Sequence, residues 1–201
     1  MSSADESGHR VRPADGSGLR RVRVVGCSGA GKTTFATALA TRIGVPRVEL
    51  DAVFWDAGWV QRDPDQAREL LAAFLAGPGR DGWVADGNWN HLLRGALDGA
   101  EQVVWLDLPR RVVVWRVLRR TVWRGVTRRE LWHGNRERLT NLLRCDPEQN
   151  IVRWAWTAYP GYRRKYTALI ATGAPVVRLT TARAARHWLA GASGVRPNGS
   201  R

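Results

Sequence analysis

Short apolar runs alternate with longer amphipathic stretches along the chain, and this pattern predicts alternating strands and helices. Five short apolar runs occupy 21–25, 47–50, 83–86, 102–109 and 175–179. Runs of this length, rich in β-branched residues, are typical of buried strands. Between them, apolar residues recur at helical spacing in 32–44, 64–76, 110–125, 151–171 and 181–191. The pattern therefore predicts five strands, each followed by a helix or a helical insertion.

Strands that alternate with helices favour an α/β fold, here a three-layer sandwich with a five-stranded parallel sheet. At 201 residues the chain is long enough for one sizeable core. Ligands of such sheets bind at the carboxyl ends of the strands. That rule places the glycine-rich turn after Val25 beside Asp51, Asp86 and Asp107, although these residues are far apart in the sequence.

The two ends of the chain differ in composition from the rest. Residues 1–20 are rich in Ser, Gly, Asp and Arg, and we expect 1–20 and 191–201 to be disordered tails around a domain at 21–190. Neither a secretory signal nor a run of about 18 apolar residues is visible, so we expect a cytoplasmic protein. The only cysteines, Cys27 and Cys145, lack metal-site spacing and are expected to be reduced thiols.

The chain is strongly basic. Its formal net charge is +14, and after Glu148 nine basic residues follow without one acidic residue. Such a field attracts anions, which include phosphates, nucleic acid and acidic membrane surfaces. Charge alone does not choose between these partners.

The segment GCSGAGKT at 26–33 matches G-x-x-x-x-G-K-[ST] between a predicted strand and a predicted helix. In this motif the glycines let backbone N–H groups converge on a phosphate, and the helix dipole adds to the same field. Lys32 would bridge the β- and γ-phosphates, and the Thr33 hydroxyl would bind Mg²⁺. The predicted nucleotide-binding residues are Gly26, Ser28, Gly29, Ala30, Gly31, Lys32, Thr33 and Thr34.

Five segments carry a family resemblance. In chain order, GCSGAGKTT, ELDAVFW, WVADGNWN, VVWLDLPRRVVVWRVLRR and LWHGNRERL resemble the adenylate-kinase-like P-loop proteins called DNA topology modulation proteins. The resemblance implies a nucleoside or small-molecule kinase fold that uses ATP and Mg²⁺. It also implies an acceptor-binding insertion at about 52–79 and an arginine-bearing lid at about 121–138. It does not supply the acceptor.

The acidic residues suggest what kind of acceptor is used. P-loop kinases that phosphorylate a hydroxyl are similar in placing an acid after the second strand, which makes Asp51 the candidate base. By resemblance to the adenylate-kinase aspartate, Asp86 would hold Mg²⁺ through water. Nucleoside monophosphate kinases hold the acceptor phosphate with an arginine at the place where this chain has Asn90. A hydroxyl acceptor is therefore predicted, and the open alternative for Asp51 is that it orders Mg²⁺ waters or caps a turn.

Aromatic residues and arginines complete the predicted site. Trp55, Trp59 and Trp89 fall in the segments expected around the acceptor, where they would either stack on it or pack internally, and Asn88 lies in the same segment. Of the many arginines near the lid, Arg120 and Arg136 are the candidates for stabilising the transferring phosphoryl group.

Two functions remain open from the sequence. The first is an ATP-dependent kinase that acts on a small molecule or nucleoside. The second is a nucleic-acid-binding regulator that uses the phosphate loop as a nucleotide sensor. The second function is suggested by the acid-free end of the chain and by the run YPGYRRKY at 159–166, where Tyr is interspersed with Arg and Lys.

Overall fold

A computed structural model describes residues 18–137, 139–143, 146 and 150–193. Five parallel strands form one sheet in the order β2-β3-β1-β4-β5. The strands are β1 (Arg21–Gly26), β2 (Arg47–Glu49), β3 (Trp83–Asp86), β4 (Gln102–Leu106) and β5 (Val176–Leu179). The helices are α1 (Lys32–Ile43), α2 (Leu50–Phe54), α3 (Pro64–Ala76), α4 (Asn90–Leu93), α5 (Arg110–Thr127), α6 (Ile151–Ala171) and α7 (Ala182–Gly191). This architecture confirms the predicted α/β class and the five-stranded parallel sheet.

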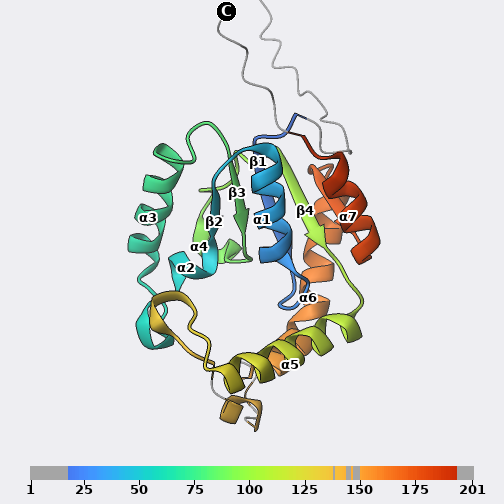
Figure 1. The fold of residues 1–201 in the computed structure, drawn as a ribbon. Helices are drawn as coiled ribbons and strands as arrows, with labels where there is room; N and C mark the ends of the chain where they lie inside the picture. The colour runs from blue at the N-terminus through green and yellow to red at the C-terminus, as the bar shows by residue number, and fades with distance from the viewer. Residues whose placement is uncertain (1–17, 138, 144–145, 147–149, 194–201) are drawn as a thin grey trace, which may run out of the picture.

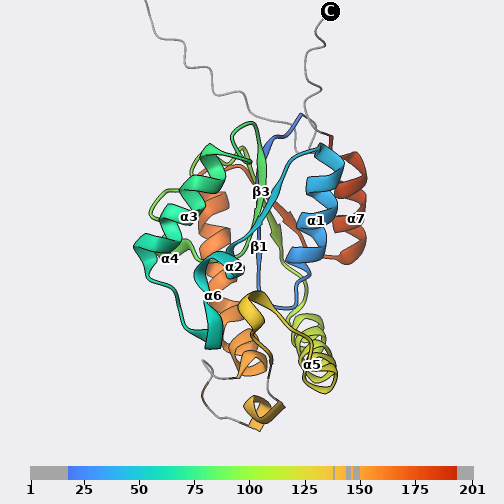
Figure 2. The same ribbon diagram turned by 60° about the vertical axis from the view of Figure 1, so that its left-hand side comes forward.

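Helices cover both faces of the sheet. Figure 2 shows α1 and α7 on one face and α3, α4 and α6 on the other. Alternate residues of β1 explain this arrangement, because Val22 and Val24 pack with α1 whereas Val25 packs with Tyr166 of α6. Strands buried on both faces read as continuous apolar runs, which is why they could be found in the sequence.

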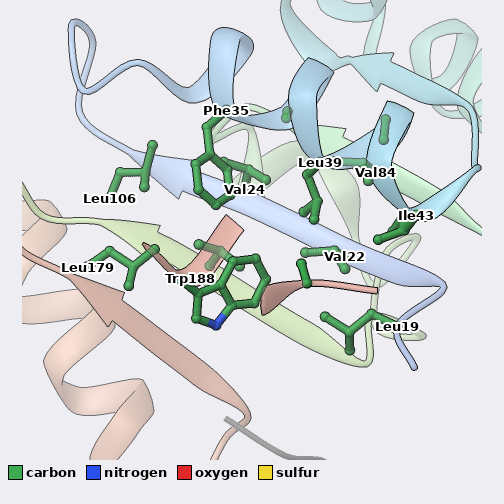
Figure 3. Close-up of a cluster of buried hydrophobic side chains, with 14 of the residues drawn as sticks. Leu19, Val22, Val24, Phe35, Leu39, Ile43, Val84, Leu106, Leu179 and Trp188 are labelled. Atoms are coloured by element: carbon green, nitrogen blue, oxygen red, sulfur yellow. The ribbon is translucent and has the colours of Figure 1, made fainter. Parts of the chain in front are cut away.

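The core between α1, α7 and the sheet extends past the predicted domain ends. Figure 3 shows Phe35 and Leu39 of α1 against Val24 of β1 and Trp188 of α7. Leu19 and Ala192 are 0% and 1% exposed in this cluster, and the Leu19 backbone N–H donates to the Ser193 carbonyl. The predicted tail boundaries at 20 and 191 are therefore corrected outward, and the remainder of both predicted tails lies outside the described residues.

Helix α5 crosses below the carboxyl ends of the strands, and the chain after it returns toward α2 (Figure 1). It packs on α6 through Val113, Val117 and Ala155, a cluster that also includes Cys27 of the turn after β1. Neither these helices nor any other within the described part of the chain is long and apolar enough to cross a membrane. The two long helices thus enclose the glycine-rich turn from one side.

Candidate functional site

The turn that joins β1 to α1 is built from glycines that no other residue could replace without strain. Gly26, Gly29 and Gly31 have φ values of 143°, 85° and 93°, a region that favours glycine. A Cβ atom on Gly26 would lie 2.6 Å from the Leu106 carbonyl oxygen, and one on Gly29 would lie 2.5 Å from the Val113 carbonyl oxygen. The turn therefore packs directly on the backbone of β4 and α5.

The N-terminus of α1 offers free backbone donors. Its N-cap is Gly31, which supplies no side-chain hydrogen bond, and α1 runs for 12 residues. The first N–H groups of a helix have no partner within the helix, and the dipole makes this end positive. An uncapped helix N-terminus after a glycine turn is the kind of place where proteins bind anions such as phosphate.

Lys32 lies at the centre of several charged groups. Its ammonium donates a 3.3 Å hydrogen bond to the Cys27 carbonyl oxygen. Burial lowers the pKa of Lys32, while the nearby Asp51 and Asp86 carboxylates oppose that shift. The motif lysine and the two predicted acids are thus brought together from three different strand ends.

Thr33 and Asp86 form the predicted metal-binding pair. The Thr33 hydroxyl donates to Asp86 Oδ2 at 2.9 Å, and Glu49 Oε1 lies 3.4 Å from the same hydroxyl. Arg47 holds the other oxygen, Asp86 Oδ1, at 2.7 Å. Burial raises the pKa of Asp86, with Arg47 opposing that shift, and burial and the adjacent Asp86 raise the pKa of Glu49. One carboxylate oxygen of Asp86 is thus aimed at Thr33.

Asp51 lies one position beyond the predicted end of β2. The strand ends at Glu49, and Asp51 is in the first turn of the short helix α2, which the sequence did not predict. The Trp89 indole N–H donates to Asp51 Oδ1 at 2.7 Å. The ring of Trp89 stacks on Phe54 and meets Trp55 edge-on, with centroid separations of 4.8 and 5.4 Å. The predicted acceptor residues Asp51, Trp55 and Trp89 are therefore one cluster.

The insertion after β2 and the segment after α5 are joined by hydrogen bonds. Asn135 is 4% exposed; its side chain accepts from the Trp59 backbone N–H at 2.9 Å and donates to the Asp56 carbonyl at 2.8 Å. The Trp59 indole N–H donates to the Arg136 carbonyl, and a His133 ring nitrogen lies 3.0 Å from the Ala52 carbonyl. We call this contact between 52–60 and 131–136 the clasp. It ties the predicted lid to the predicted insertion.

Two residues of the clasp have unusual backbone conformations. Trp59 and His133 have φ values of 60° and 56°, which side chains larger than glycine rarely adopt. Trp132 also meets Trp59 edge-on at a centroid separation of 6.3 Å. Strain of this kind persists where surrounding contacts fix it, and it clusters at functional sites.

Two of the inward arginines approach the loop and the acids. Burial and the neighbouring Arg124 lower the pKa of Arg120, while the carboxylates of Glu137, Asp51 and Glu49 oppose that shift. Its buried Nε has no hydrogen-bond partner in the described part of the chain. Arg116 Nη1 lies 3.9 Å from the position of a Cβ on Gly31. Arg136, predicted as a second catalytic arginine, is instead half-exposed and pairs with Glu130. The side chain next to it, Asn135, is the one that reaches the insertion.

Other sequence expectations are corrected by the contacts. Asn88, expected at the acceptor, holds the loop, because its amide donates to the Gly26 carbonyl at 2.8 Å and accepts from the Gly26 N–H. Asp107, which follows β4, binds Arg178 at 2.5 Å, and the N-cap of α5 is Pro109. Gly125, within the segment expected to form the lid, is inside α5, where a Cβ would collide with Leu139.

Three residues of the site were not found in the sequence. Glu49 was passed over, although its place two residues before Asp51 puts both acids at the carboxyl end of one strand. Trp132 lies in the segment LWHGNRERL, which carries part of the family resemblance, but no feature of the neighbouring sequence predicts its contact with Trp59. Asn135 has no sequence signal, because its role depends on backbone groups about 80 positions away.

Comparison with known proteins adds fold-level likeness only. No protein-family model and no curated protein matches the chain. A gluconokinase from Sinorhizobium meliloti 1021 aligns over 86% of this chain and 90% of its own, with 19% identity and a TM-score of 0.48. A sugar kinase from Janibacter sp. HTCC2649 aligns over 86% of this chain and 91% of its own, with 19% identity and a TM-score of 0.43. These values transfer no activity, and membership of the DNA topology modulation subgroup stays a prediction.

Proposed function

We propose that this chain is an ATP-dependent kinase that transfers the γ-phosphoryl group to a hydroxyl of a small-molecule or nucleoside-type acceptor. The observation that carries the proposal is the convergence of an uncapped helix N-terminus, Lys32 and Asp51 beside one glycine turn. Phosphoryl transfer needs little covalent chemistry from the protein, so positioning and charge neutralisation are what the chain must provide.

The residues present fit a magnesium nucleotide. Mg²⁺ in kinase sites is bound through one or two carboxylates together with substrate phosphates, and does not need a dedicated protein cage. The described residues contain no cluster of three or more metal-binding side chains, and Thr33, Asp86 and Glu49 supply a hydroxyl and two carboxylates in contact. When bound, the ion would neutralise charge on the phosphates. The chain would orient it with Thr33 and, through water, with Asp86.

We propose that the nucleotide base binds in a pocket next to the loop. A pocket of ≈ 260 Å³ is lined mainly by apolar groups of the α5 start and the β5–α7 connection: Leu108, Pro109, Val112, Arg116, Thr180, Thr181 and Ala182. Arg116 links this pocket to Gly31 of the loop. A base in the pocket would therefore leave its phosphates at the α1 N-terminus.

Asp51 is suited to accept the proton of a hydroxyl. Trp89 occupies Oδ1 and fixes the carboxylate, so the proton would go to Oδ2. Asn90, which stands where a phosphate-binding arginine would be needed for a nucleotide acceptor, binds Arg23 at 2.7 Å and Tyr166 at 3.2 Å instead. Asn90 is thus held between Arg23 of β1 and Tyr166 of α6, which supports a hydroxyl acceptor over a phosphate acceptor.

The nucleic-acid alternative loses one of its two supporting observations, the tyrosines of the run 159–166. Tyr159 of the run 159–166 donates to the Leu108 carbonyl, Tyr162 packs in the α6 core, and Tyr166 is 2% exposed against Trp105. Burial raises the pKa of Tyr162 to about 12. These rings are directed into the protein, so the run does not present them for stacking on bases.

Incubation with γ-labelled ATP, Mg²⁺ and pooled acceptors tests the proposal. The pools would be sugars and polyols, nucleosides, nucleoside monophosphates and DNA ends, each separated by thin-layer chromatography. Label transfer to a sugar, polyol or nucleoside hydroxyl that Asp51→Asn abolishes would support the proposal. Transfer only to monophosphates would contradict it.

A further inference from the structure

Helix α5 carries exposed tryptophan and valine side chains on the side away from the phosphate loop. Trp115 and Val126 are 62% and 69% exposed, and Trp123 is 50% exposed. Val122 is also exposed, and so is Trp156 of the neighbouring helix α6. We call these five residues the tryptophan face. Exposed apolar surface of this extent marks an interaction site more often than chance.

The two sides of α5 carry different arginines. At about 100° per residue, Arg111, Trp115, Arg119, Val122 and Val126 fall within an arc of about 80°. Arg116, Arg120 and Arg124 fall within a second arc of about 80° that starts about 60° beyond Arg119, and Trp123 lies between the two arcs. Arg116 reaches the loop, and Arg124 pairs with Glu137. The outward arginines Arg111 and Arg119 are exposed and flank Trp115.

The face is cationic as well as apolar. Neither α5 nor α6 contains an acidic residue. Arg110 lies over the Trp156 ring, with its guanidinium carbon 3.5 Å from the ring centroid, and Arg129 lies over Trp123 at 5.4 Å. Between the two helices, an apolar groove of ≈ 280 Å³ is lined by Val114, Val152, Arg153, Trp156 and Thr157.

Exposed apolar side chains, exposed arginines and the absence of acidic residues from α5 and α6 together decide between three possible partners for this face. A second copy of the chain would bring two acid-free, arginine-bearing faces together, which like charges oppose. A single-stranded nucleic acid would use open ring faces, but Arg110 covers one face of Trp156, and Val122 and Val126 offer nothing to bases. A bilayer surface with anionic headgroups uses all three features, because tryptophan and aliphatic groups enter the interface while arginines bind headgroup charge.

We propose that the tryptophan face of α5 and α6 docks the protein on an anionic lipid membrane surface. Docking would place α5 flat on the headgroups with Trp115, Val122 and Val126 inserted and Arg111 and Arg119 beside them. The same helix carries Arg116 and Arg120 on its inner side, so the membrane-bound face and the nucleotide site share one rigid element. The inference does not depend on the proposed kinase activity.

Flotation of the full chain with vesicles tests the inference without any nucleotide. One set of vesicles is pure phosphatidylcholine and the other contains about one third phosphatidylglycerol, at about 0.1 M salt. We expect flotation with the anionic vesicles only, and its loss at about 1 M salt. Arg111→Gln/Arg119→Gln and Trp115→Ser/Val126→Ser should each lower the partition coefficient about tenfold or more.

Matched controls separate the face from bulk charge and bulk hydrophobicity. Arg183→Gln/Arg186→Gln removes the same charge from exposed positions of α7, and Leu70→Ser removes an exposed apolar group from α3. Both should leave flotation within about twofold of the parent chain. Circular dichroism would check that each variant is folded. If Trp115→Ser/Val126→Ser unfolds, Arg111→Gln/Arg119→Gln still tests the proposed membrane docking.

Four results would overturn the inference. These are no flotation with anionic vesicles, equal loss in the α7 control, unchanged flotation in both face variants, and a dimer in sedimentation that Trp115→Ser/Val126→Ser dissociates. The last result would assign the face to a second copy of the chain. None of them would bear on phosphoryl transfer, which is measured separately.

Discussion

The indole N–H of Trp89 donates a 2.7 Å hydrogen bond to Oδ1 of Asp51, across a separation of 38 positions in the chain. The bond joins the segment after β3 to the helix after β2, and it fixes the direction of a carboxylate close to Lys32. A carboxylate can act as a general base only when it is held in the correct orientation toward the proton that it accepts. The bond from Trp89 gives Asp51 a fixed orientation of this kind.

Replacing Asp51 by Asn separates catalysis from nucleotide binding. The amide oxygen can still accept from Trp89, so the fold should persist, but the proton acceptor is lost. We expect the turnover number to fall about 10²–10⁴-fold while Mg-ATP affinity changes less than about twofold. Trp89→Phe, which keeps the ring stacked on Phe54, should give a smaller fall. Full turnover in Asp51→Asn would remove Asp51 as the base.

Loss of Asn135 should open the clasp. Asn135→Ala would leave the Trp59 N–H and the Asp56 carbonyl without their partner, which costs about 1–3 kcal/mol. Hydrogen exchange should become faster in 52–60, and urea unfolding should show the lost stability. Glu130→Gln, which breaks the exposed pair with Arg136, should cost less than about 1 kcal/mol. Unchanged exchange in 52–60 after Asn135→Ala would refute the clasp.

Two glycines with the same strain but different surroundings give a matched pair. Gly29→Ala would drive a Cβ into the Val113 carbonyl and Val117, whereas a Cβ on Gly44, at φ 70°, meets nothing within 4 Å. The backbone conformation alone costs about 1–2 kcal/mol, and overpacking adds about 1–3 kcal/mol at Gly29. Denaturant unfolding should therefore rank Gly29→Ala clearly below Gly44→Ala. Equal losses would contradict the close contact of the loop with α5.

The thiol of Cys27 gives a pH-dependent prediction. Burial raises its pKa, with Lys32 opposing the shift, and its Sγ contacts the Ala155 carbonyl. The unfolded thiol ionises near pH 8.5 and the folded thiol at a higher pH, so this contribution to stability is complete below about pH 8.5 and is lost as the pH rises toward the folded pKa. In a Cys145→Ser chain, iodoacetamide should not label the folded protein at about pH 8.5 but should label it in urea. Rapid labelling of the folded chain would contradict the burial.

The sequence predicted the strands and long helices well because both sheet faces are buried. Continuous apolar runs identified β1, β3 and β4, and the Pro64 start and Gly77 stop gave the bounds of α3 without error. Helix α2 was missed because five residues, LDAVF, show too little periodicity to separate a helical turn from a strand end. The inner ends of the tails were missed because each contributes a single buried apolar residue, Leu19 or Ala192, and one residue gives no recognisable pattern in the sequence.

The residues of the candidate site also differ in whether a local sequence pattern identifies them. The glycine turn from Gly26 to Gly31 and the start of the following helix could be predicted from a local motif, and the strand ends placed Asp51 and Asp86 at the expected edge of the sheet. Residues whose roles depend on distant backbone could not. Asn135 reaches Asp56, Asn88 reaches Gly26 and Asp107 reaches Arg178, and no spacing rule connects such pairs.

Isothermal titration calorimetry of Mg-ATP with the parent chain and with Lys32→Met tests whether the glycine turn and Lys32 bind a magnesium nucleotide. Lys32 is half-buried among Asp51, Asp86 and the loop, and Met retains its length without the charge. The account predicts saturable binding to the parent chain and a loss of about 100-fold or more in affinity for the variant, because a buried charge-assisted contact to phosphate is removed. No binding to the folded parent chain, or equal binding to both, would contradict it.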